Sequence, residues 1–197
     1  LDEPKDEMMK VWKREFDFLK VKFSLSEVRI NPKFSKLRPP NFPTIRLSQL
    51  ANLYHSQPNL FSKIIEAKTI DDLYLIFDNV SASEYWDNHF NFGKISPVES
   101  QKLLSKDFID LIIINSILPI KYFYQKNHNP EIVEDIFDLY KQLKSEKNSV
   151  LDEWKNLGVK FENALQTQAF LYQYKTFCTQ KKCLNCSIGF QLLKSQD

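Results

Sequence analysis

The chain has 197 residues, of which 43% are hydrophobic and 14% are aromatic, and its formal net charge is +2. This composition is sufficient for one domain, or two tightly packed lobes, with a substantial core. The small net charge gives no overall attraction to nucleic acid, so any such binding depends on a local basic patch. Only three glycines are present. They are too few for a Rossmann loop, a P-loop or a hairpin-rich β fold, which need several positive φ angles. We therefore predict an all-α fold.

Capping residues and apolar residues at helical spacing predict an orthogonal multi-helix bundle that forms a single domain over residues 1–197. A long helix is expected within residues 1–23, an ordered connector over 24–43, and the bundle proper over 44–197. The apolar face of the first helix is expected to carry Met8, Trp12, Phe16, Leu19 and Phe23. The further helices are expected at 45–54, 58–67, 69–77, within 85–93, from Ser96, at 108–124, 131–143, 148–158 and 164–177.

Local residues mark the ends of several of these helices. Thr69 with Asp72 resembles a capping box, and Asn129-Pro130 is expected to cap the helix at 131–143. Asn148 or Ser149 is expected to begin the next helix and Gly158 to end it.

A proline-rich arm leads into the second of these helices. Pro39, Pro40 and Pro43 fix φ and remove three backbone donors, so the segment from Arg38 to Pro43 should be extended rather than helical. Thr44 then fits the N-cap position of the helix.

The segment from Phe108 to Leu118 is apolar nearly all round, which indicates a helix surrounded by protein. It is too short to span a bilayer. A buried strand is the alternative, but the upstream caps favour a helix. Pro119 should kink this helix near Asn115, whose carbonyl loses its donor.

We expect the bundle to be organised around the helix from Ile109 to Tyr124, with the arm from Arg38 to Arg46 packed across it. Asp110 is the unusual polar residue of that helix, and a pair with Arg38 or Arg46 would explain it.

Several sequence blocks occur in an order that matches a known family. They are Arg38–Leu47, Tyr85–Trp86 with His89 and Phe92–Gly93, Ile109–Asp110 and Ile114–Asn115 with Pro119, and Cys178 with Cys183–Gly189. From about residue 36 onward the chain resembles the bacterial family catalogued as domain of unknown function 2851, which is common among Bacteroidetes.

The resemblance implies that part of the family pattern is missing from this chain. Family members are about twice as long, and their N-terminal half carries an Asp-Ala-Gly-Pro-Asp-Phe block and a Val-Glu-Ile-His block similar to the acidic metal site of PD-(D/E)xK nucleases. Neither block occurs here. The chain is therefore expected to be a fragment, the helical C-terminal region of a nuclease-like protein, with that N-terminal half as its partner. Any nuclease-like chemistry would belong to the partner.

A basic cluster without acidic neighbours lies on the proline-rich arm. Lys36, Arg38, Asn41 and Arg46 would suit contacts with nucleic-acid phosphates. The alternative is that the arginines bind helix C-terminal carbonyls or carboxylates and pin the arm to the bundle.

Trp86 and His89 lie in an aromatic segment and are further candidates for nucleic-acid contact. An imidazole that titrates near neutrality could also act as a general base. A single histidine without a neighbouring carboxylate is more often structural, so both interpretations stay open.

Cys178, Cys183 and Cys186 share one loop, and the two-residue spacing of the second pair is typical of zinc or iron–sulfur ligands. No fourth cysteine follows, so buried, reduced cysteines are the alternative, and no cofactor is expected otherwise. The absence of a secretory signal and the reduced thiols favour a cytoplasmic protein without a membrane partner.

Three functions follow from these observations. The first is a helical accessory domain of a nuclease-like protein that contacts nucleic acid. The second is a structural or protein-interaction domain, which predicts an exposed apolar patch and no affinity for nucleic acid. The third is an enzyme in its own right, against which stands the lack of a nucleophile, base and orienting group at recognisable spacing.

Overall fold

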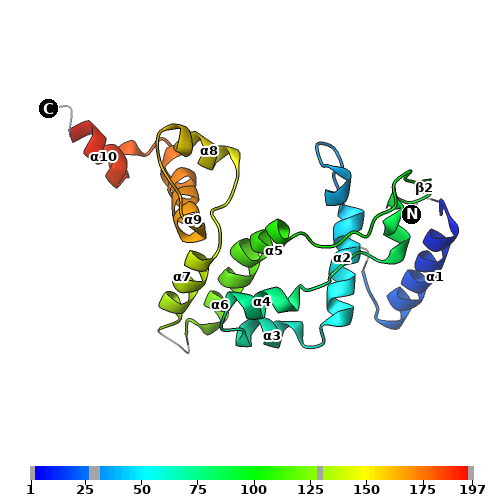
Figure 1. The fold of residues 1–197 in the computed structure, drawn as a ribbon. Coiled ribbons are helices and arrows are strands. Elements are labelled where there is room, and N and C mark those ends of the chain that lie inside the picture. The colour runs from blue at the N-terminus through cyan, green and yellow to red at the C-terminus, as the bar shows by residue number, and fades with distance from the viewer. Residues whose placement is uncertain (1–2, 27–31, 128–130, 195–197) are drawn as a thin grey trace. The chain divides into compact units, whose positions relative to one another are not determined.

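The computed structural model describes residues 3–26, 32–127 and 131–194 (Figure 1). Over these ranges the predicted all-α fold is confirmed, because the elements are mainly helices and the one sheet has two short strands. The α-helices are α1 (Glu7–Lys22), α2 (Pro43–Ser56), α3 (Leu60–Glu66), α4 (Ile70–Ile76), α5 (Lys106–Ile112), α6 (Leu118–Gln125), α7 (Ile132–Gln142), α8 (Ser149–Asn156), α9 (Ala164–Gln173) and α10 (Ser187–Lys194).

Two compact units divide the chain. Unit 1 contains residues 1–60 and 76–105, and unit 2 contains residues 61–75 and 106–197. The proline-rich arm belongs to unit 1 and the helix from Ile109 to Tyr124 to unit 2, so the expected packing of one across the other stays a prediction. Each unit is described by itself below.

The proline-rich arm of unit 1 leads into α2, which begins two residues earlier than predicted. Residues Pro39–Asn41 form a single 3₁₀ turn, and Phe42 is the N-cap with an extended backbone (φ −62°, ψ 144°). Pro43 is the first helical residue, where the missing N–H costs nothing. The predicted N-cap, Thr44, instead donates its hydroxyl to the Phe90 carbonyl (2.8 Å).

The predicted helix within residues 85–93 is wrong. This segment contains a 3₁₀ turn (Glu84–Asp87) followed by a hairpin of β1 (His89–Asn91) and β2 (Lys94–Ile95). Gly93 has φ +68° at the turn, which glycine adopts without strain and which ends any helical path.

The helix predicted from Ser96 is also wrong, because the chain stays irregular until α5 begins at Lys106. The backbone N–H groups of Ser96 and Ser100 donate to the carbonyls of Asn88 (2.6 Å) and Asp87 (2.9 Å). These long-range bonds replace the helical ones.

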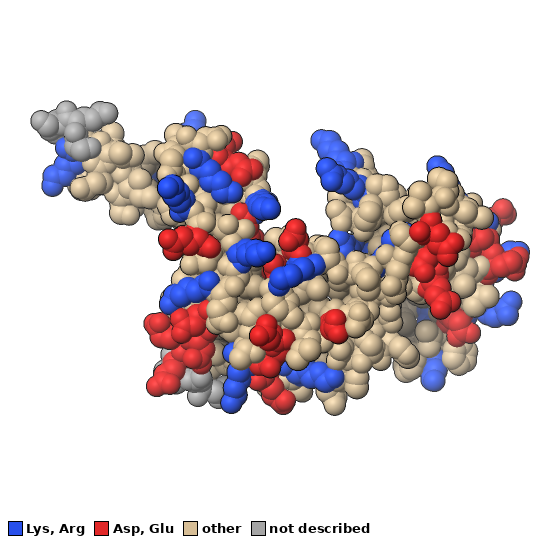
Figure 2. All heavy atoms as spheres, viewed as in Figure 1, with Lys and Arg blue, Asp and Glu red and all other residues tan. Residues whose placement is uncertain are grey.

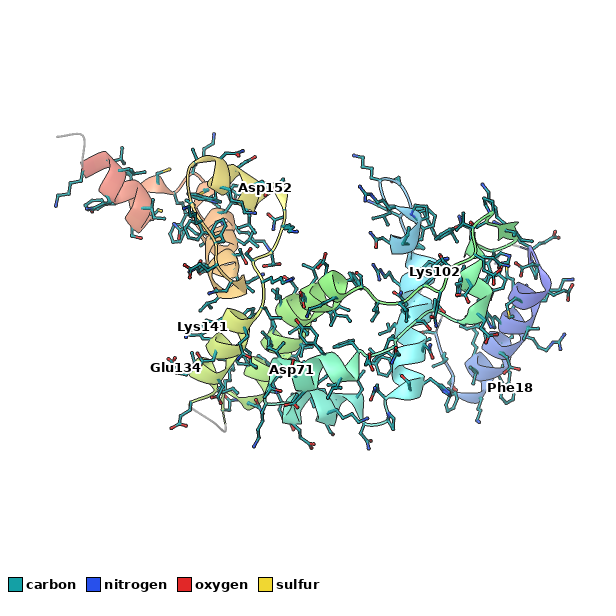
Figure 3. All side chains as sticks on the ribbon, in the orientation of Figure 1. Phe18, Asp71, Lys102, Glu134, Lys141 and Asp152 are labelled. Carbon is teal, nitrogen blue, oxygen red and sulfur yellow. The ribbon has the colours of Figure 1, made fainter. Side chains whose placement is uncertain are left out.

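Lys102 holds this irregular segment in place. Its side chain lies beside α2 (Figure 3) and the residue is 6% exposed. Its ammonium donates to the carbonyls of Asp87 (2.9 Å) and Ser100 (2.6 Å) and lies 4.7 Å from the centre of the Phe90 ring. The Lys102 carbonyl in turn accepts from the Gln49 side chain (2.7 Å). The Lys102 ammonium is therefore buried without a carboxylate partner among the described residues, because backbone oxygens accept its hydrogen bonds.

The apolar segment of unit 2 is a helix, as predicted, with a π-helical stretch (Ile113–Ile117) between α5 and α6. In the π register the Leu118 N–H bonds the Ile113 carbonyl. Pro119, which has no N–H, therefore leaves the Ile114 carbonyl free, rather than that of Asn115 as expected. The Tyr140 hydroxyl of α7 donates to this Ile114 carbonyl (2.8 Å).

Local capping predictions in unit 2 are confirmed. Thr69 and Asp72 form a reciprocal capping box, with the Thr69 hydroxyl accepting from the Asp72 N–H (3.1 Å) and the Asp72 carboxylate accepting from the Thr69 N–H (2.8 Å). Asn148 caps α8 through the Leu151 N–H (3.0 Å), and Gly158 follows that helix with φ +90°. The Asn129-Pro130 cap predicted for α7 lies outside the described residues.

Lys121 closes the C-terminal end of α3. The residue is 3% exposed, and its ammonium donates to the carbonyls of Ile64 (2.9 Å), Ile65 (2.7 Å) and Ala67 (2.8 Å). Burial lowers the Lys121 pKa from its ordinary value, although the charges of Asp135 and Asp72 oppose this effect. A seven-residue helix leaves its last four carbonyls without intrahelical donors. Lys121 supplies donors to two of these, the carbonyls of Ile64 and Ile65, and to that of Ala67 just beyond the helix.

Replacing Lys121 by methionine should lower the free energy of unfolding by about 2–4 kcal/mol, because three carbonyls lose their donor inside the protein. Urea denaturation followed by far-UV circular dichroism measures this change. Lys141→Met is the matched control, since Lys141 forms an exposed pair with Asp138 (2.8 Å) and its loss should leave the free energy of unfolding nearly unchanged. Equal losses in the two variants would contradict the capping role.

Candidate functional site

The arm residues nominated from the sequence divide into two groups. Arg46 donates to the side-chain oxygens of Asn41 (2.5 Å) and Gln49 (2.9 Å), and desolvation by burial lowers its pKa from the ordinary value. These bonds connect the 3₁₀ turn to α2. They resemble the alternative in which the arginines hold the arm to the bundle, except that the acceptors are side-chain amide oxygens rather than carboxylates or helix carbonyls. Lys36 and Arg38 are exposed on the same arm.

Trp86 lies in the aromatic core of unit 1 and is 2% exposed. Its ring centre lies 6.0 Å from that of Trp12 in α1 and 5.2 Å from that of Phe92 after β1. Its indole N–H is buried and has no hydrogen-bond partner within the described residues. Trp86 thus contributes to packing, and its role as a nucleic-acid contact stays a prediction.

A groove of about 500 Å³ lies over this aromatic core. Trp12, Trp86 and Phe92 form one side, and Leu47 and Ser48 of α2 belong to its lining. Pockets of this size with mostly apolar walls and a few polar groups are typical binding sites.

His89 belongs to a polar network that holds the N-terminus of α1. Its ring stacks on Tyr85 (4.2 Å between centres, 13° between planes), and its Nδ1 lies 2.9 Å from the Tyr85 carbonyl. The Tyr85 hydroxyl donates to the Asp6 carboxylate, which raises the Tyr85 pKa to about 12 together with the larger effect of burial. Asp6 also accepts from the backbone N–H groups of Met9 (2.8 Å) and Gly93 (2.7 Å).

This network makes Asp6 the main polar connection of α1. It is the N-cap of the helix and at the same time binds the hairpin turn at Gly93. A Cβ atom at Gly93 would lie 2.8 Å from the Cβ of Lys5, so the close approach requires glycine. No local sequence pattern predicts this contact, because Asp6 and Gly93 are far apart in the chain.

Asp110 has polar partners within unit 2. Its carboxylate accepts from the Tyr74 hydroxyl (2.6 Å), and the Lys106 ammonium lies 3.9 Å away. Burial and this carboxylate raise the Tyr74 pKa. The expected pair with Arg38 or Arg46 would join the two units and stays a prediction.

A buried carboxylate lies beside the π-helical stretch and has no cationic partner among the described residues. Glu146 is 8% exposed, and its oxygens accept from the side-chain amides of Asn115 (3.2 Å) and Gln168 (2.6 Å) and from the Thr167 hydroxyl (3.4 Å). The Asn115 amide also donates to the Leu111 carbonyl (3.1 Å). Neutral donors therefore stabilise the charge.

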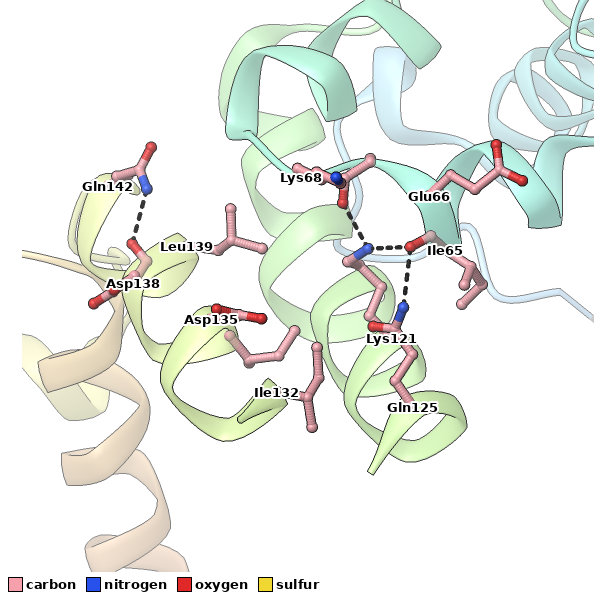
Figure 4. Close-up of a pocket in the computed structure, with 12 residues that line it drawn as sticks. Ile65, Glu66, Lys68, Lys121, Gln125, Ile132, Asp135, Asp138, Leu139 and Gln142 are labelled. Atoms are coloured by element: carbon pink, nitrogen blue, oxygen red, sulfur yellow. Dashed lines mark hydrogen bonds between the residues drawn. The ribbon is translucent and has the colours of Figure 1, made fainter. Parts of the chain in front are cut away.

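A second cavity lies in unit 2, between the C-terminal end of α3 and the helices α6 and α7 (Figure 4). Its volume is about 710 Å³, and Lys121, Gln125 and Asp135 line it. No residue of this cavity was nominated from the sequence, because its polar groups lie on three separate elements.

The three cysteines differ in exposure. Cys186 is buried, and its sulfur accepts from the Gln173 amide (2.7 Å). Cys178 and Cys183 are exposed. In the described part of the chain, no three His, Cys, Asp or Glu side chains converge as metal ligands would, and the metal site stays a prediction.

The model of one protein family matches residues 1–149, and its description is "Protein of unknown function (DUF2851)". The chain belongs to this family. The matched part of this family member includes the arm, the aromatic core and the cavity of unit 2, whereas the cysteine loop follows it. No curated protein and no solved structure matches the chain. None of the described helices has the length and apolar composition needed to cross a membrane.

The Asp6 network predicts an acid-sensitive contact of α1. Burial alone would raise the Asp6 pKa. The hydrogen bonds from Tyr85, Met9 and Gly93 together lower it by more than burial raises it, so the Asp6 pKa is below its ordinary value. Its stabilising contribution is present above the unfolded-state pKa and is lost as the pH falls through the folded-state value, below about pH 4.

The Gly93 amide resonance in NMR spectra should report this titration directly. Asp6→Asn should abolish the titration and loosen α1 at neutral pH, whereas Asp17→Asn on the same helix should leave it unchanged. A Gly93 titration that persists in Asp6→Asn would contradict this role of Asp6.

Proposed function

We propose that this chain is a protein-interaction module that docks through the exposed apolar side of α1. The observation that carries the proposal is the exposure of this helix. None of its 16 residues is buried, and Phe16, Leu19 and the adjoining Phe23, which share the side of the helix that carries Trp12, are 40%, 39% and 58% exposed. Phe18 lies on the C-terminal half of α1 (Figure 3).

The apolar stripe predicted along α1 is covered over only part of its length. Trp12 packs against Tyr85, with ring centres 5.6 Å apart. Farther along the stripe, Phe16 and Leu19 remain 40% and 39% exposed. Lys22 lies near the Phe18 and Phe23 rings (5.8 and 5.2 Å) but belongs to the same helix. Contiguous exposed apolar surface of this kind marks interaction sites.

Trp12 also lines the groove over the aromatic core. The stripe and the groove therefore share a residue and offer a partner one apolar surface with a concave end. Each large apolar side chain that a partner buries contributes about 1.5–3 kcal/mol, so a few such contacts suffice for a stable complex.

The partner that we propose is the nuclease-like half implied by the family resemblance. An accessory domain that supports such a half requires an exposed apolar patch, and α1 supplies one within the residues that match the family model.

The double variant Phe16→Ser, Phe23→Ser should weaken binding to a separately produced nuclease-like half of a family member at least about tenfold, because two exposed anchors of the stripe are lost. Isothermal titration calorimetry measures the affinity. Leu157→Ser is the control, since Leu157 is 77% exposed in unit 2 and should not affect binding. The proposal fails if the unmodified chain does not bind, or if the double variant binds as well.

Contact with nucleic acid is a second candidate function, favoured by the arm. Lys36 and Arg38 are exposed, and no acidic residue occurs from residue 32 to residue 61. Figure 2 shows Lys and Arg side chains, without acidic neighbours, over the loop that precedes α2. Because the small net charge gives no overall attraction to nucleic acid, binding depends on a local basic patch, and the arm provides one.

Titration with short single- and double-stranded DNA and RNA at two salt concentrations tests this candidate. Binding through phosphates should weaken steeply with salt, and the variant Lys36→Ala, Arg38→Ala should reduce the logarithmic salt slope by about 2. Lys141→Ala in unit 2 is the control. An unchanged slope, or no binding at low salt, would rule out the arm as a phosphate contact.

A further inference from the structure

The groove over the aromatic core of unit 1 favours an uncharged occupant. None of the residues that line it is Lys, Arg, Asp or Glu. Its walls consist of three aromatic rings and of the aliphatic side chains of Leu47 and Ala51 on α2. A charged group placed here would lose hydration and would gain no counter-charge from these residues. The groove therefore suits a neutral, mainly apolar group.

The rings of the groove favour an aromatic occupant over an aliphatic one. Trp86 is 2% exposed, so the accessible ring surface comes mainly from Trp12 and Phe92, which are half-buried. Their ring centres lie 5.6 Å apart with 81° between the planes, and the Phe92 ring lies 5.2 Å from Trp86 at 62°. A further ring can continue this edge-to-face packing, which stabilises a complex beyond burial alone.

Most polar side chains of the groove form hydrogen bonds within unit 1. The Thr44 hydroxyl and the Asn52 amide donate to backbone carbonyls at 2.8 Å and 2.9 Å. The Ser48 hydroxyl accepts from the Ser83 N–H (3.0 Å) and donates to the Ser83 hydroxyl (3.4 Å). These bonds join α2 to the segment before the 3₁₀ turn, so they maintain the groove.

His55 adds a free acceptor to the groove. It lies in the last turn of α2, and its imidazole forms no hydrogen bond or ion pair with any described residue. A neutral imidazole has one ring nitrogen that accepts a hydrogen bond. A ring that carries a single N–H or O–H therefore finds both an aromatic surface and an acceptor here.

We propose that the groove receives a tryptophan or tyrosine side chain of the partner that docks on α1. This inference rests on the proposed function, because Trp12 belongs to both the apolar stripe of α1 and the groove. A partner that lies along the stripe reaches the groove without leaving apolar surface. Its ring would pack against Trp12 and Phe92, and its N–H or O–H would donate to His55. Tryptophan and tyrosine are enriched among the residues that dominate binding energy at interfaces.

Titration of the chain with N-acetyl-tryptophanamide at about pH 8, where an imidazole is ordinarily neutral, tests the groove without the partner. NMR spectra should show saturable shifts of the amides of Leu47, Ser48 and His55 and of the Trp12 indole. N-acetyl-cyclohexylalaninamide, whose ring is aliphatic and has no donor, should bind at least about threefold more weakly.

Three variants of α2 separate the contributions to binding. Leu47→Ser should weaken binding of N-acetyl-tryptophanamide at least about threefold. Leu50→Ser is the matched control, because Leu50 is also exposed on α2 but does not line the groove, and it should change binding less than about twofold. His55→Phe should reduce the preference for N-acetyl-tryptophanamide over N-acetyl-phenylalaninamide, which lacks the ring donor.

Calorimetry with the nuclease-like half distinguishes this inference from the proposed function. N-acetyl-tryptophanamide should compete with the half, and Leu47→Ser should weaken binding of the half at least about threefold. If the half binds but the amide neither competes nor gives saturable shifts, the inference is overturned and the proposed function stands. Equal binding of the cyclohexyl analogue, or equal effects of the two leucine variants, also overturns the inference. If the half does not bind, both fail, and saturable shifts with the amide would then indicate a free aromatic molecule as the occupant.

Discussion

Backbone carbonyl groups without a helix or strand partner are the constraint on which both units depend. Short helices and a long irregular segment leave many such groups inside the protein. In unit 1, Lys102 joins the carbonyls of Asp87 and Ser100. In unit 2, Lys121 joins three carbonyls at the end of α3. Each lysine thus connects segments that are distant in sequence, and an apolar residue of equal volume would fill the space without satisfying the oxygens.

The π-helical stretch follows the same constraint. Pro119 cannot donate, and the change of register moves the free carbonyl to Ile114, where the Tyr140 hydroxyl reaches it. The bond fixes α7 against the helix that carries Ile113 and Leu118, both fully buried. Burial raises the Tyr140 pKa to about 12, with a smaller effect of the Glu146 charge, so the hydroxyl keeps its proton at neutral pH. A proline that weakens one helix therefore determines how the next one packs.

The sequence predicts what local chemistry decides. The capping box at Thr69, the cap at Asn148 and the stop at Gly158 each depend on a few neighbouring residues, and all three are confirmed. The hairpin was missed because Gly93 is used through Asp6, far away in the chain. The buried lysines were missed for a related reason: their partners are backbone carbonyls, which every residue supplies, so no residue pattern marks them. The polar groups of the unit 2 cavity are dispersed over separate elements in the same way.

The attachment of α1 connects fold and function. Within the described residues, its polar and aromatic contacts with the rest of unit 1 involve Asp6 and Trp12, near its N-terminal end. The half that carries Phe16 and Phe18 contains no buried residue, and an isolated helix of this length is marginal in water. A partner that buries this half would also stabilise its helical state, so binding and helix order are coupled. In the complex that we propose, the partner rather than the fold would complete the apolar face of this helix, in which none of the 16 residues is buried.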